Sequence, residues 1–140
     1  MRILLLFILL HCFDNVLSQD LVGIWKGSYS SYGNKSEITI SLRIELDKDS
    51  LLAIRSFTLL KDYIGRDFIS IYKVKVLKHK DRILNLEEID STGISAIGLQ
   101  RMFLKYRKEK NSEILEGNWN TGSGDRSHSG LISFIKLSDQ

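Results

Sequence analysis

Hydrophobic and polar residues alternate with a period of two along most of this chain. The clearest case is Glu37–Asp47, in which Ile and Leu occupy every even position from 38 to 46 and polar residues fill most positions between them. Successive side chains of a β-strand point to opposite faces, so this segment predicts a strand with one buried and one solvated face. Proline is absent, and clusters of Gly, Asn, Asp and Ser divide the chain at short intervals.

Similar alternation predicts seven further strands. The eight predicted strands are Leu21–Ser30, Glu37–Asp47, Leu51–Leu60, Asp67–Lys78, Arg82–Asp90, Leu99–Lys108, Glu113–Asn120 and Gly130–Leu137. Many short strands are typical of a sandwich or a barrel, and consecutive hairpins favour an up-and-down barrel, which has no exposed sheet edge. We therefore expect an all-β fold, an eight-stranded antiparallel up-and-down barrel, which is either filled by side chains or holds one small ligand.

The first 18 residues have a different pattern. Arg2 precedes an apolar run, Ile3–Leu10, and small or apolar residues lead up to Ser18. An aspartate and an asparagine end the run short of the roughly 20 apolar residues that a membrane anchor needs. The pattern predicts a signal peptide over 1–18 and a single barrel domain over 19–140, located outside the cytoplasm in the periplasm or the medium. Cys12 is the only cysteine, so this domain would contain no disulfide.

Hairpin registers follow from the rule that paired strands point apolar residues the same way. Around His79–Asp81 this rule favours a three-residue loop, with Val74 opposite Leu86 and Tyr72 opposite Glu88. A two-residue loop would mix the two faces.

The same rule predicts a two-residue loop at Glu109-Lys110, which sets Leu104 opposite Leu115 and Gln100 opposite Trp119. Phe103 would then face outward.

Loop lengths predict that the two ends of the barrel differ. The connections at 47–50, 79–81 and 108–112 are tight, whereas those at 31–35, 61–66, 91–98 and 121–129 are mostly longer and rich in Gly, Ser and Asn. In an up-and-down barrel these two sets lie at opposite ends, and binding residues tend to lie near long loops.

The inward residues nearest the long-loop end are the candidate ligand-binding residues: Tyr29, Tyr72, Glu88, Gln100 and Trp119. Aromatic walls with a few polar groups suit a small-molecule pocket. A carboxylate that faces a barrel interior needs water or a partner, which makes Glu88 the most informative member. The alternative is that Glu88 lies in water at the rim of a barrel that is packed shut.

Two segments resemble each other, Leu21–Ser28 and Leu115–Gly122, and each places Gly two residues before Trp. Glycine allows close approach of a neighbouring chain, and Trp fills space. Gly-x-Trp on the first strand resembles the calycin superfamily, which includes lipocalins and avidins. Trp119–Ser123 followed by Gly130–Lys136 looks like the last two strands of an avidin. The resemblance implies a calycin-like barrel with a general binding role. Avidins carry an aspartate in the last strand that binds biotin; Leu131-Ile132 stands in that neighbourhood here, which speaks against biotin.

Composition excludes several classes of function. The formal charge of +3 and pI near 9.0 are too mildly basic for a dedicated nucleic-acid domain. His79 and His128 are far apart, and no cluster has metal-ligand spacing. Asp125–His128 contains catalytic residue types on one loop, without a scaffold to hold a base against a nucleophile.

We therefore expect an exported, non-catalytic binding module without cofactor or metal, which takes a small, partly apolar ligand at the long-loop end. The alternative is a protein-interaction or inhibitor module that uses the barrel as a scaffold, with Phe103 and the long loops as its contact surface. A hydrolase or isomerase would require a strongly shifted pKa in the cavity, for which Glu88 is the only candidate.

Overall fold

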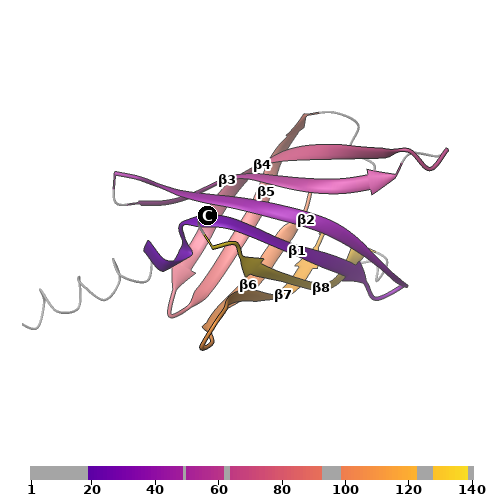
Figure 1. Ribbon diagram of the computed structural model, residues 1–140. Helices are drawn as coiled ribbons and strands as arrows, with labels where there is room; N and C mark the ends of the chain where they lie inside the picture. Colours follow the sequence, from indigo (N-terminus) through magenta and orange to yellow (C-terminus); the bar gives the residue numbers. More distant parts are fainter. Residues whose placement is uncertain (1–18, 49, 62–63, 93–98, 123–127, 139–140) are drawn as a thin grey trace, which may run out of the picture.

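The computed structural model describes residues 19–48, 50–61, 64–92, 99–122 and 128–138. Within them lie eight strands: β1 (Gly23–Ser31), β2 (Asn34–Asp47), β3 (Ser50–Lys61), β4 (Asp67–Lys80), β5 (Ile83–Thr92), β6 (Arg101–Lys108), β7 (Glu113–Asn120) and β8 (Ser129–Lys136). They form one closed antiparallel barrel in sequence order, and β8 pairs with β1 (Figure 1). The predicted fold class is confirmed. The predicted signal peptide, 1–18, lies outside the described residues.

The chain enters the barrel through a helical turn instead of a strand. Residues 19–21 are helical, and β1 begins at Gly23, two residues later than predicted. Gly23 has a φ of +138°, a conformation that side chains rarely adopt. Leu21 is fully buried, and its carbonyl accepts a hydrogen bond from Trp25 Nε1 at 2.9 Å. The turn therefore covers this end of the barrel, beside the end of β8 (Figure 1).

Gly117 explains the second Gly-x-Trp segment by close approach of two strands. A Cβ on Gly117 would lie 1.9 Å from the backbone oxygen of Phe103 on β6. No side chain fits there without moving the strand, so the glycine allows β6 and β7 to pack closely.

The predicted hairpin register between β4 and β5 is wrong. The turn is Asp81-Arg82, with Lys80 opposite Ile83, and both turn residues have positive φ, 52° and 66°. Positive φ at both central residues is the geometry of a type I′ hairpin, whose twist matches that of the strands. Val74 pairs with Glu88 instead of Leu86.

Irregularities in this strand pair restore the alternation that a plain two-residue hairpin would have broken. The register shifts between Val76 and Lys78, and again between Lys73 and Val74. A bulge inserts one extra residue in one strand, which returns the following side chains to their original face. Tyr72 and Val74 of β4 and Leu84 and Leu86 of β5 therefore face inward, whereas Leu77 and Ile89, next to the two register shifts, are exposed.

The β6–β7 register also differs from the prediction. Four residues, 109–112, form the connection, and Tyr106 lies opposite Leu115. Met102, and not Gln100, lies opposite Trp119. The shift is two residues along the strand, so every side chain keeps its predicted face, and Phe103 is exposed on the outside.

The barrel interior has two unlike halves. The half near the tight turns is apolar, with the core residues Leu21, Trp25, Leu42, Ile44, Leu84, Leu86, Met102, Leu104, Tyr106, Leu115 and Phe134. The half near the other end contains the buried polar residues Ser56, Thr58, Ser70, Glu88 and Gln100. One connection at that end, β1–β2, is a two-residue turn and is shorter than expected.

Candidate ligand-binding site

The structure buries all five predicted site residues inside the long-loop half of the barrel. Tyr29, Tyr72, Glu88, Gln100 and Trp119 are between 1% and 3% exposed. They come from β1, β4, β5, the residue before β6, and β7. Because Glu88 is buried, the alternative that it lies in water at the rim does not hold.

Sequence reasoning missed three further members of this site. Ser56 and Thr58 on β3 and Ser70 on β4 are at most 1% exposed. Ser56 lies opposite Tyr72, one of the predicted residues, and Thr58 and Ser70 lie opposite each other.

The missed residues lie where the usual alternation is inverted. On β3, Ser56 and Thr58 face inward, while Leu59 faces outward and is 41% exposed. A register shift between β2 and β3 near Arg43 and Ile44 accompanies this inversion. The signal was present in the sequence as apolar residues at both odd and even positions, but position alone did not tell which set faces inward.

Glu88 is held by two hydrogen bonds. The Ser56 hydroxyl donates to Oε1 at 2.5 Å, and the backbone N–H of Gln100 donates to Oε2 at 3.0 Å. Burial raises the pKa of Glu88 to about 7, because the charged form loses its hydration, and these two hydrogen bonds counter part of that effect. The carboxyl group is therefore divided between its protonated and ionised forms near neutral pH.

Aromatic rings line the opposite side of the site. The rings of Tyr29 and Trp119 meet edge to face with centroids 5.0 Å apart, and Trp119 Nε1 donates to the carbonyl of Ser30 at 3.0 Å. Burial raises the pKa of Tyr29 above its ordinary value, and the neighbouring Tyr72 and Glu88 add to the shift. A side-chain contact with Gln100 counters part of it, so Tyr29 interacts electrostatically with three of the other predicted residues, Tyr72, Glu88 and Gln100.

Several buried polar atoms in this half have no hydrogen-bond partner of ordinary geometry among the described residues. They are Thr58 Oγ1, Ser70 Oγ, Gln100 Oε1 and Tyr29 Oη; the Gln100 side chain lies close enough to Tyr29 to lower its pKa, but outside ordinary hydrogen-bond geometry. An unpaired buried polar group costs about 1–3 kcal/mol, so such groups usually meet water or a ligand. These atoms, from β1, β3, β4 and the residue before β6, are available to hydrogen-bond to water or to a ligand.

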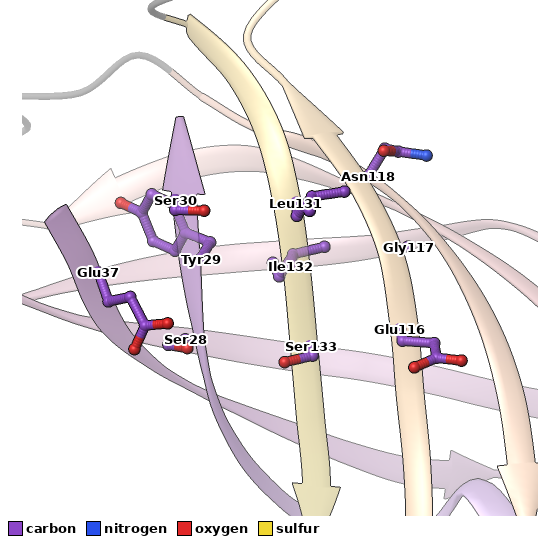
Figure 2. Close-up of a pocket in the computed structure, with 10 residues that line it drawn as sticks. All are labelled: Ser28, Tyr29, Ser30, Glu37, Glu116, Gly117, Asn118, Leu131, Ile132 and Ser133. Carbon is purple, nitrogen blue, oxygen red and sulfur yellow. The ribbon is translucent and has the colours of Figure 1, made fainter. Parts of the chain in front are cut away.

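A hollow lined by described residues lies elsewhere, on the outer wall. It measures about 460 Å³ and crosses β8, with Glu37 of β2 on one side and Glu116 of β7 on the other (Figure 2). Outward serines form much of its floor, and Tyr29 is the one predicted site residue that borders it. A second hollow of about 430 Å³ lies at the tight-turn end, beside the β6–β7 connection.

Metal-binding groups and membrane-spanning helices were also sought among the described residues. They contain no group of three or more His, Cys, Asp or Glu side chains placed to hold a metal ion. No helix in the described part of the chain is long and apolar enough to span a membrane. Most of the loop Asp125–His128 lies outside the described residues.

The fold and the buried group define a class, a closed eight-stranded antiparallel up-and-down β-barrel with a polar cluster inside one end. No protein-family model matches the chain, and no curated protein or solved structure matches it either.

Proposed function

We propose that this protein is an exported, non-catalytic β-barrel that binds a small, partly apolar ligand inside its long-loop end. The observation that carries the proposal is the set of buried polar atoms without partners, beside the Tyr29–Trp119 ring pair. Closed barrels of eight strands commonly hold one small ligand in such a place.

The contrast between the two halves of the interior supports this proposal. The tight-turn half is an apolar core around Trp25, Leu104 and Phe134. In the other half Ser56, Thr58 and Ser70 place small polar side chains where larger apolar ones would pack better. Polar residues that weaken a core are expected where they have a binding role.

A calycin-like identity, of the lipocalin or avidin type, belongs to this proposal. The barrel has the same strand number and connectivity as that superfamily, and Trp25 follows a glycine on the first strand. The apolar run at 3–10 supports export to the periplasm or the medium.

The chain's two tryptophans allow a direct test. Trp119 lies in the proposed site, whereas Trp25 lies in the apolar half and donates to Leu21. We would titrate the ¹⁵N-labelled protein with small aromatic alcohols and amines and follow both indole N–H signals by NMR. A ligand in the site shifts the Trp119 signal saturably and leaves the Trp25 signal in place. Equal shifts of both signals, or no saturable shift of Trp119, would overturn the proposal.

One observation favours the alternative, a protein-interaction module. Outward apolar residues of β3 and β4 pair across the strands, Phe57 with Ile71 and Leu59 with Ile69, and Ile69 is 60% exposed. Exposed apolar surface of this kind marks interaction sites. If this surface is functional, Ile69→Thr weakens association measured by sedimentation, while Trp119→Phe does not.

A further inference from the structure

When Glu88 is ionised, the buried polar groups of the long-loop half have more unused acceptor positions than donor positions. Gln100 Oε1 accepts only, and the ionised Glu88 carboxylate accepts only. The Ser56 proton is already donated to Glu88, so its remaining capacity is as an acceptor. The hydroxyls of Tyr29, Thr58 and Ser70 both donate and accept. A ligand with several donors therefore complements this set, since each of the three hydroxyls can accept a hydrogen bond from it.

The ionised form of Glu88 also leaves a buried negative charge in this half. Glu88 is 1% exposed, and no Lys, Arg or His is buried among the residues whose burial the structure describes. The nearest residue on its strand, Glu87, points outward and has its own partner, Arg101, at 2.8 Å. A buried carboxylate is stable in its charged form only with a cation or several donors beside it.

We propose that the ligand is a small cationic amine with an apolar or aromatic body, its ammonium group directed at Glu88 and Gln100 Oε1 and its body against Tyr29 and Trp119. This inference rests on the proposed function and specifies the ligand class for that site. An ammonium group supplies three donors and a positive charge. The faces of Trp and Tyr rings attract cations as well.

Other ligand classes fit the site less well. A carboxylate ligand would meet Glu88 as a like charge. A neutral alcohol satisfies some of the hydroxyls, but it leaves the Glu88 charge without compensation. The titratable groups that face Glu88 within the described interior are the phenols of Tyr29 and Tyr72, and neither supplies a positive charge.

The test compares three probes of the same size at pH 8: benzylamine, benzyl alcohol and benzoate. Binding is measured by calorimetry and by the Trp119 indole signal. We expect benzylamine to bind at least about 10-fold more tightly than benzyl alcohol, since a compensated buried charge is worth more than a neutral hydrogen bond. Benzoate should not bind.

Two variants test whether the Glu88 carboxylate itself, and not the neighbouring surface charge, determines the preference for an amine. Glu88→Gln keeps the size of the side chain and should lower the benzylamine affinity about 10-fold or more, while benzyl alcohol affinity changes by less than about 3-fold. Glu87→Gln, its outward neighbour on β5, is the matched control and should change neither affinity. Lowering the pH from 8 to 6 should weaken benzylamine binding to the wild type and not to Glu88→Gln, since protons compete for the carboxylate.

The outcomes distinguish this inference from the proposed function. If benzyl alcohol binds as tightly as benzylamine and shifts Trp119, or if Glu88→Gln binds benzylamine as the wild type does, the amine class is wrong and a binding role remains. If no probe shifts Trp119 and a crystal structure shows only ordered waters at Thr58, Ser70 and Gln100, both proposals fail.

Discussion

Glu88 and Gln100 are joined twice inside the barrel. The backbone N–H of Glu88 donates to the carbonyl of Gln100 at 2.9 Å, and the backbone N–H of Gln100 donates to the Glu88 carboxylate at 3.0 Å. The Glu88 side chain on β5 therefore holds the residue just before β6 in place, on the far side of the β5–β6 connection. Both residues are buried, so the carboxylate is a structural tether as well as the most polar group of the candidate site.

The pH dependence of stability should report Glu88. Its pKa is raised from 4.5 to about 7 in the folded protein, so between these values the folded protein holds a proton that the unfolded chain has lost. The free energy of unfolding should therefore fall as pH rises through this window, by up to about 3 kcal/mol, and level off above it. Chemical denaturation of wild type and Glu88→Gln at pH 5 and pH 8 measures this.

For that comparison, Glu88→Gln should be more stable than the wild type at pH 8 and similar to it at pH 5. Glu87→Gln, on the outer face, serves as the control and should show the wild-type pH profile. A pH profile that is identical in wild type and Glu88→Gln would contradict the assigned shift.

Thr58→Val should separate stability from binding. The Thr58 hydroxyl is buried and has no hydrogen-bond partner among the described residues, and valine has nearly the same shape. Replacing an unsatisfied buried hydroxyl with a methyl group should leave stability unchanged or raise it by about 1 kcal/mol. Probe binding at Trp119 should weaken. A loss of stability above about 1 kcal/mol would mean that the hydroxyl is satisfied, for example by an ordered water.

Gly117→Ala should destabilise the barrel strongly. The added methyl group would lie 1.9 Å from the backbone oxygen of Phe103, so β6 and β7 must move apart. We expect a loss of about 2 kcal/mol or more, as for other overpacked sites, measured by thermal or urea unfolding. Ser133→Ala, on the exposed face of β8, is the control and should lie within about 0.5 kcal/mol of the wild type.

Arg82→Gly should stabilise the β4–β5 hairpin. Arg82 has a φ of 66°, which is costly for a side chain and free for glycine. The type I′ turn favours glycine at this position, so we expect a gain of up to about 1 kcal/mol in unfolding experiments. Lys80→Gly, one step before the turn in β4, should instead lower stability. Equal effects of the two substitutions would contradict the assigned turn.

The sequence by itself determined the number of strands and the faces of most of them. Ile40, Leu42 and Ile44 alternate with polar residues, and this period of two is a local property that holds in any sheet. It also located the buried site residues, because Tyr29, Glu88 and Trp119 lie on the inward parity of their strands near the long loops. The odd or even position of a residue in its strand, together with loop length, was therefore sufficient to identify the buried site residues.

Only the tertiary structure decided which residues meet. A slip of two residues leaves every side chain on the same face, so the sequence could not distinguish Leu104 opposite Leu115 from the observed Tyr106 opposite Leu115. Positive φ at Asp81 and Arg82 and the two register shifts between β4 and β5 set the β4–β5 pairing, and neither was indicated by the alternation of residues. The hydrogen bond from Ser56 to Glu88 likewise joins residues from non-adjacent strands, because barrel closure, and not local pattern, brings them together.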